Sequence, residues 1–327
     1  MQSARRLFLL IAILTVLSVV WGTQASHADT FYVATDGDDG NAGTQESPFQ
    51  TIRRGAQALS AGDTLIVQGG TYSQGSDHIV IPSGASSSQP VTVQAASGET
   101  VVLQATEQTD TIVFFEDGSQ HIIFDGFSLD ANDLATWALA IGDASHISVR
   151  NCEMKNALDS GMLVFGHSHE FSNLEVHDNG ASTFEHGLYI QSSQTRVESS
   201  HFYNHPGYGI HAHGEGGDSN IFDSNLIENN ATGGIVVANG ENNEVIGNTI
   251  SHNGIGLLLE APGSIVKNNT IVDSTGTSGD EGKGIVIRDS GGEGLILEGN
   301  TICGNPDGAI IGVTSATVEN NNFCDNE

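Results

Sequence analysis

Three stretches of the sequence repeat one pattern: SNLIENN at residues 224–230, GNTISHN at residues 247–253 and NNTIVDS at residues 268–274. Each stretch places an apolar residue at its fourth position and polar residues at both ends. Short apolar segments bounded by Asn, Gly and Ser are typical of β-strands. The pattern recurs along the chain with its apolar centres 21 to 31 residues apart, at Leu129, Met154, Val176, Phe202, Ile227, Ile250, Ile271, Ile302 and Phe323.

A second short motif accompanies the first and begins with glycine. It reads GMLVF, GLYIQ, GIHAH, GIVVA, GLLLE and GIVIR, starting at Gly161, Gly187, Gly209, Gly234, Gly256 and Gly284. Two or more strands in every repeat of this length make one coil of a parallel β-solenoid, whose coils stack at the strand spacing of ~4.8 Å. The sequence therefore predicts an all-β protein, a parallel β-helix of about nine or more coils.

Stacked coils bring equivalent residues of successive repeats into one column. Asn is an ordinary turn residue, but amides stacked in register can also hydrogen-bond along the stack, and the fixed register favours such a ladder. Cys303 and Cys324 each follow a centre on adjacent coils, so we expect a disulfide between them. Cys152 falls in the inward-facing ladder column and is expected to be a buried free thiol. The ladder column contains Asn225, Asn248, Asn269, Asn300 and Asn321.

Residues 31–72, FYVATDGDDGNAGTQESPFQTIRRGAQALSAGDTLIVQGGTY, resemble the N-terminal part of exported right-handed parallel β-helix proteins of the pectate-lyase-like superfamily. Together with the repeats, the resemblance covers essentially the whole chain after residue 28. It implies a cap with the first strands at residues 29–75 and a right-handed parallel β-helix at residues 76–327. An amphipathic segment of the cap would cover the open end of the helix. Its apolar side carries Phe49, Ile52, Ala56 and Leu59.

Residues 1–28 have the pattern of a signal peptide. Arg5 and Arg6 precede an apolar run of about fifteen residues, and small residues precede Asp29. The run is short for a membrane span of roughly twenty residues, so we expect cleavage, with an uncleaved anchor as the alternative. We therefore expect a secreted, periplasmic or cell-surface protein that is monomeric and has no membrane span after removal of the signal.

The chain is strongly acidic, with 40 Asp plus Glu against 10 Lys plus Arg and a net charge of −30. Nucleic-acid binding needs Lys and Arg contacts to phosphate, so this composition argues against a nucleic-acid partner. General electrostatic attraction would not capture an acidic polysaccharide either, because that substrate would need a bridging cation or a local basic group.

A cluster of polar residues lies on the glycine-led strands. The apolar positions of this motif alternate and face the interior, so the residues between them face outward. Two adjacent coils place Tyr189, Gln191, His211 and His213 there, flanked by apolar surface, and His186 precedes the first strand. Metal binding, proton transfer or sugar contact, and a solvated surface without a task are all open interpretations. We take Tyr189, His211 and His213 as catalytic candidates, and Gln191 and His186 as substrate-binding candidates.

A second set of outward residues surrounds Lys155, which lies between Asp130 and His177 of the adjacent coils. Uronide lyases of the fold that the chain resembles often use Lys or Arg to remove the C5 proton, with calcium neutralising the carboxylate. The resemblance therefore implies Lys155 as a catalytic candidate, Arg150 and His177 as substrate-binding candidates and calcium as a candidate cofactor. Ion pairing of Lys155 and Arg150 with acidic neighbours is the alternative interpretation.

The segment DGDDGNAG at residues 36–43 has the residue types of a calcium-binding loop. Asp36, Asp38 and Asp39 would be the metal ligands, because calcium prefers carboxylate oxygens. An ordinary polar turn built from the same residues is the alternative.

Taken with the resemblance, these features lead to one expected function and one alternative. We expect an exported, carbohydrate-active protein that acts on a polysaccharide, as a lyase-like enzyme with a uronic-acid substrate. The paired aspartates of the hydrolases of this fold find no match, and YIQ at residues 189–191 stands where mannuronan epimerases carry Asp-Pro-His. The alternative is a non-catalytic surface, adhesion or glycan-binding rod, because the fold alone does not select a function.

Overall fold

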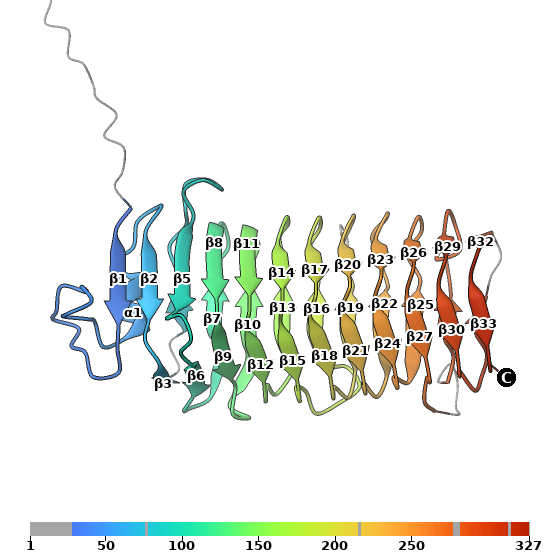
Figure 1. Cartoon of the computed structure of the whole chain (residues 1–327), viewed down its shortest axis with the longest axis horizontal. Coiled ribbons are helices and arrows are strands. Elements are labelled where there is room, and N and C mark those ends of the chain that lie inside the picture. Colours follow the sequence, from blue (N-terminus) through green and yellow to red (C-terminus); the bar gives the residue numbers. More distant parts are fainter. Residues whose placement is uncertain (1–27, 76–77, 215–216, 277–281, 313–314, 327) are drawn as a thin grey trace, which may run out of the picture.

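The computed structural model describes residues 28–75, 78–214, 217–276, 282–312 and 315–326, so the expected signal peptide, apart from Ala28, lies outside the described residues. In these residues the strands form three parallel sheets that run along an elongated solenoid (Figure 1). Ten complete coils of the described chain each contribute one strand to every sheet. The predicted parallel β-helix is therefore confirmed.

The strands alternate among the three sheets in chain order. The twelve-stranded sheet contains β1 (Thr30–Val33), β2 (Thr64–Val67), β5 (Val91–Ala95), β8 (Gln120–Asp125), β11 (Ser145–Arg150), β14 (Glu170–Ser172), β17 (Arg196–Glu198), β20 (Ile221–Asp223), β23 (Glu244–Ile246), β26 (Ile265–Lys267), β29 (Ile296–Glu298) and β32 (Thr317–Glu319). The eleven-stranded sheet contains β3 (Gly70–Gln74), β6 (Val101–Ala105), β9 (Phe127–Asp130), β12 (Glu153–Lys155), β15 (Glu175–His177), β18 (His201–Tyr203), β21 (Leu226–Glu228), β24 (Thr249–Ser251), β27 (Thr270–Val272), β30 (Thr301–Cys303) and β33 (Asn322–Cys324). The ten-stranded sheet contains β4 (Ile79–Val80), β7 (Thr109–Phe115), β10 (Ala135–Ile141), β13 (Met162–Val164), β16 (Leu188–Ile190), β19 (Tyr208–Ala212), β22 (Gly233–Val237), β25 (Ile255–Leu259), β28 (Ile285–Ile287) and β31 (Ile310–Ile311).

A residue in the left-handed conformation turns the chain from the twelve-stranded sheet toward the eleven-stranded sheet. Asn151 and Asn173 have φ values of 53°, and Gly126 has a φ value of 87° at the same turn of another coil. Gly and Asn are the residues that tolerate this region best. The requirement explains why Asn, Gly or Ser stands shortly before the apolar centres of the repeat.

The apolar centres form the interior of the helix, except Phe323 on β33 at the C-terminal end, which is 48% exposed. Met154, Val176 and Phe202 are fully buried, and their register is continuous from β12 through β15 to β18. Phe124 and Phe127 stack with ring centroids 4.3 Å apart. Burial of each large apolar side chain contributes about 1.5–3 kcal/mol, so the long core stabilises the stack of coils.

The Asn ladder predicted from the repeats is present, and its members are buried except for the half-buried Asn321. The first four ladder residues each donate from Nδ2 to Oδ1 of the Asn on the next coil, over distances of 2.8 to 3.0 Å. The Nδ2 of Asn321, the last of the ladder, donates to the carbonyl of Leu297. The same Oδ1 atoms also accept from the backbone N–H groups of the preceding coil. The ladder therefore satisfies polar groups at an interior corner that would otherwise lack partners.

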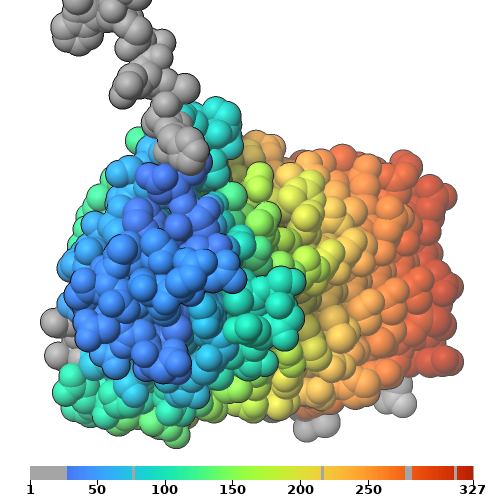
Figure 2. Space-filling model, turned by 60° about the vertical axis from the view of Figure 1, so that its left-hand side comes forward, coloured from blue at the N-terminus to red at the C-terminus, as the bar shows by residue number. Residues whose placement is uncertain are grey.

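The N-terminal segment covers one end of the solenoid (Figure 2, blue). Its short helix α1 (Ile52–Ala56) begins after Thr51, whose side chain accepts from the N–H of Arg54. The four apolar residues predicted on one side of this segment are buried, with at most 7% exposure at Leu59.

The structure confirms both predictions for the cysteines. A disulfide joins Cys303 to Cys324, with Cα atoms 4.6 Å apart, and Cys152 is buried without a bridge. None of the described residues forms a helix that is long and apolar enough to cross a membrane.

Candidate functional site

Five polar side chains gather on the outer face of the ten-stranded sheet. Tyr189 on β16 lies in register with His211 on β19, while their neighbours Ile190 and Ala212 are buried. The Tyr189 hydroxyl is 3.3 Å from Nδ1 of His213, and Nδ1 of His211 is 2.8 Å from Nε2 of His186. We call Tyr189, His186, His211, His213 and Gln191 the tyrosine–histidine patch.

The backbone fixes the proton positions of one histidine pair. The N–H of Tyr208 donates to Nδ1 of His186 over 3.0 Å, so a neutral His186 carries its proton on Nε2. That proton is donated to Nδ1 of His211. A neutral His211 consequently carries its own proton on Nε2, so its remaining ring nitrogen is a hydrogen-bond donor.

Both members of this pair are neutral at pH 7. Burial lowers the pKa of His186 to about 4, with a further contribution from His205. Burial, together with the neighbouring His186 and His213, lowers the pKa of His211 to about 3. A low pKa agrees with the geometry, because a protonated imidazole could not accept the hydrogen bond that each Nδ1 receives.

Two hollows flank the tyrosine–histidine patch along the helix axis. The N-terminal hollow has a volume of about 720 Å³ and is lined by Phe114, Trp137 and Phe165, with Gln191 at its margin. The C-terminal hollow, of about 290 Å³, includes His213 in its lining. The patch therefore lies in the path of an extended ligand that would follow the axis across this face.

The apolar surface expected beside the patch is partly absent. Val236, Leu258 and Val286 occupy the outward column after His211, but each is at most 5% exposed. They pack with Ile255 into a small cluster outside the main core, against which Tyr208 also packs. The prediction of apolar surface on that side was wrong, because alternation gives the direction of a side chain but not what covers it.

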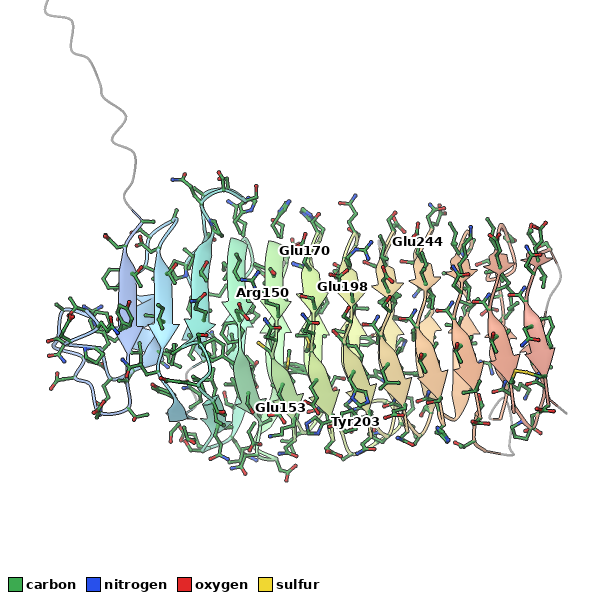
Figure 3. The ribbon with its side chains drawn as sticks, viewed as in Figure 1. Arg150, Glu153, Glu170, Glu198, Tyr203 and Glu244 are labelled. Atoms are coloured by element: carbon green, nitrogen blue, oxygen red, sulfur yellow. A yellow bond between two sulfur atoms is a disulfide. The ribbon has the colours of Figure 1, made fainter. Side chains whose placement is uncertain are left out.

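Lys155, Arg150 and His177 lie away from the patch, on the other two sheets (Figure 3 labels Arg150 and Glu153). Lys155 Nζ contacts both carboxylate oxygens of Glu153 at 2.9 Å. Burial raises the pKa of Glu153, but hydrogen bonds from Lys155, Ser128 and His177 outweigh this effect and lower the pKa to about 2. Lys155 is thus held in an ion pair with a residue of its own strand.

The other two candidates are held by similar contacts. His177 lies between Glu153 Oε1 at 3.1 Å and Asp178 Oδ2 at 2.7 Å. The Nε of Arg150 contacts the carboxylate of Asp125 at 2.9 Å. These contacts match the ion-pairing interpretation of the sequence.

The residues of the expected calcium loop make turn and capping contacts. Asp39 accepts hydrogen bonds from the N–H groups of Gln50 and Thr51 and from the Thr51 hydroxyl. Asp38 accepts from the N–H of Gly40. Over the described ranges, no group of three or more His, Cys, Asp or Glu side chains, Asp36 included, is arranged to hold a metal ion. Calcium binding by this loop therefore stays a prediction, and we derive no chemical step through a metal ion.

Two buried histidines have structural contacts that sequence reasoning missed. His205 is 1% exposed, accepts from the N–H of Asn179 and lies 3.1 Å from the carbonyl of Val176 through Nε2. It stands three residues after its apolar centre, where other coils carry Asn179, Asn230 and Asn253. His169 is likewise buried, next to the carbonyl of Phe165. The second Asn column in the repeat was the available signal for His205.

The buried histidines predict that acid weakens the fold before most carboxylates titrate. The pKa values of His169, His186 and His205 are lowered to about 4 by burial, whereas an unfolded chain binds their protons near pH 6.5. Each group therefore contributes stability that is complete above about pH 6.5 and decreases as the pH falls, by about 1.4 kcal/mol per pH unit.

Thermal unfolding between pH 7.5 and pH 5 measures this effect. We expect the midpoint to fall with pH, and to fall less in His205→Asn, which places the usual amide in that column. A midpoint that is unchanged or rises toward pH 5 would contradict the assignment of buried neutral histidines.

Comparison with known proteins identifies the family of the chain. The family described as "Pel9A-like, right handed beta helix region" matches residues 31–205, and the description "Right handed beta helix region" matches residues 163–323. Pectate lyase PEL9 of Emericella nidulans is 36% identical over 84 residues, which are 26% of this chain and 20% of that protein. The chain thus aligns with only a fifth of the length of this relative.

Solved structures agree with the fold at low sequence identity. The crystal structure of pectate lyase Pel9A has a TM-score of 0.63 and 14% identity, covering 90% of this chain and 80% of that chain. The Dettilon tailspike protein has a TM-score of 0.60 and 15% identity, covering 90% and 68%. Since the family match extends over more than half of the sequence, the chain belongs to the Pel9A-like family of right-handed β-helix proteins.

Proposed function

We propose that the protein is an exported polysaccharide lyase that cleaves a uronic-acid-containing glycan at the tyrosine–histidine patch. The observation that carries the proposal is the Tyr189–His213 contact beside the neutral His186–His211 pair, between two hollows of one face. The similarity to a pectate lyase over 84 residues and to the structure of Pel9A supports this reaction class.

In this proposal His211 binds the uronate carboxylate. Its Nε2–H is the donor left after the pairing with His186, and a donor placed there stabilises the charge that develops when the C5 proton leaves. A neutral imidazole in a largely buried position supplies this hydrogen bond without its own desolvated charge. His211 therefore acts as a carboxylate-binding donor rather than as the base.

Tyr189 and His213 carry the proton transfers. One member of the pair takes the C5 proton as the C4–oxygen bond breaks, and the other gives a proton to the leaving glycosidic oxygen. Transfer through their hydrogen bond then restores the starting protonation states. The products are an unsaturated uronate end and a new hydroxyl end, so atoms and protons balance without a water molecule.

A panel of polysaccharides tests the proposal. The protein is incubated with uronic-acid homopolymers and with mixed polymers that alternate uronic acid and neutral sugar, and absorbance near 235 nm is followed. We expect absorbance to rise with at least one member. Binding without any unsaturated product across the panel would contradict the lyase and leave a glycan-binding rod, as in the alternative from the sequence.

A further inference from the structure

We infer that the hollow on the N-terminal side of the patch is a subsite for an uncharged sugar unit, bound against Trp137. The inference deepens the proposed function and rests on it for the direction of the chain. The substrate class then becomes a mixed glycan, with a uronic acid at His211 and a neutral sugar at Trp137.

The lining of the hollow extends to the patch. Leu139 on β10 lies in register with Met162, which lies in register with Leu188 on β16. Gln191 of the tyrosine–histidine patch lines the hollow together with Trp137. Leu163, which also lines the hollow, is the register partner of Tyr189. One glycan can therefore contact both places.

The lining of the hollow combines aromatic and acidic groups. Trp137, Phe114 and Phe165 are only partly buried, so their rings are accessible from the hollow. The faces of aromatic rings carry partial negative charge and attract the polarised C–H groups on the apolar face of a sugar ring. Carboxylates around such a platform accept hydrogen bonds from sugar hydroxyls. The lining carboxylates are Asp110, Asp117 and Asp143.

The charge of the hollow disfavours a uronate at this place. No lysine or arginine of the described chain lines it, whereas three aspartates and one histidine, His78, which packs edge-to-face with Phe114, do. A uronate carboxylate would be desolvated among like charges, which costs free energy, while a neutral sugar would use the same aspartates as acceptors. The whole chain has a net charge of −30, so the surrounding field does not reverse this preference.

Trp137 itself supplies the measurement, because the chain has two tryptophans, Trp21 and Trp137. In the full chain carrying Trp21→Phe, the tryptophan emission comes from Trp137 alone. The protein is titrated in EDTA with cellohexaose, xylohexaose, mannohexaose and galactohexaose, and in parallel with hexagalacturonate and hexamannuronate. We expect a saturable change in emission with at least one uncharged hexasaccharide and none with the oligouronates at equal concentrations.

Variants test whether the uncharged sugar binds in the hollow or elsewhere on the protein. In calorimetry with the uncharged hexasaccharide that binds, Trp137→Ala is expected to weaken binding about tenfold or more, whereas Tyr203→Ala on the eleven-stranded sheet leaves it unchanged. The double variant Asp110→Asn and Asp143→Asn is expected to reduce the difference in affinity between the uncharged hexasaccharide and the oligouronates. Equal or tighter binding of oligouronates, or no emission change with any uncharged probe, would overturn the inference.

The titration does not depend on cleavage, so the two proposals fail separately. Emission changes without unsaturated products from the polysaccharide panel would refute the lyase and keep the neutral-sugar subsite. Unsaturated products without emission changes would refute the subsite and keep the lyase.

Discussion

Tyr189→Phe is expected to lower the turnover of the cleaved polysaccharide by about 10²- to 10⁴-fold, the usual contribution of a general acid–base group. The substitution removes only the hydroxyl that contacts His213 and keeps the ring that packs beside His211. Because Tyr189 lies on the outer face, the free energy of unfolding should change by less than about 1 kcal/mol. Initial rates at 235 nm, with urea unfolding of the same preparations, measure both effects.

Companion variants separate catalysis from folding. His211→Ala should also reduce the rate strongly, because the carboxylate then loses its hydrogen-bond donor. His252→Asn is the matched control: His252 is an exposed turn residue with φ of 55°, in a column where other coils carry Asn229 and Asp273. Full activity in Tyr189→Phe would contradict the proposal that the reaction takes place at the tyrosine–histidine patch.

The largest effect on stability is expected for Asn248→Ala in the ladder. Asn248 Oδ1 accepts from the backbone N–H and Nδ2 of Asn225, and its Nδ2 donates to the carbonyl of Phe222 and to Asn269. Truncation leaves four buried polar groups without these partners, at about 1–3 kcal/mol for each group that remains unsatisfied. We expect the free energy of unfolding to fall by about 4 kcal/mol.

Urea denaturation followed by circular dichroism measures this loss. Asn239→Ala, at an exposed position outside the ladder, is the control and should change stability by no more than about 0.5 kcal/mol. A loss below about 1 kcal/mol for Asn248→Ala would show that the corner relaxes or that water replaces the amide, against the account of the ladder.

The sequence predicted the fold because every coil needs the same few residues in the same places. Asn248 and its equivalents must hydrogen-bond the buried polar groups at an interior corner, and apolar centres such as Ile250 must fill the core. The same residue types therefore recur at the same positions of each repeat. The patch was predicted for a related reason. Strand alternation sets the direction of Tyr189 and His211, and the parallel register brings them together.

Other features depended on side-chain packing that no repeat encodes. Lys155 pairs with Glu153 of its own strand rather than with Asp130 of the adjacent coil. Strand alternation alone does not predict which of these acidic residues Lys155 contacts. The hollow beside Trp137 was missed because that coil lacks the glycine that marks the motif in later coils. The proton positions of His186 and His211 depend on the backbone N–H of Tyr208, whose position beside His186 follows only from the folded structure.

The most direct test of the central claim is a crystal structure of Tyr189→Phe in complex with an oligosaccharide of the polymer that the wild-type protein cleaves. The slow turnover expected of this variant should keep the oligosaccharide intact in the complex. The account predicts a uronate carboxylate within hydrogen-bond distance of His211 Nε2 and the sugar chain lying along the ten-stranded sheet. An oligosaccharide bound instead on the eleven-stranded sheet beside Lys155 and His177, with the tyrosine–histidine patch empty, would contradict it.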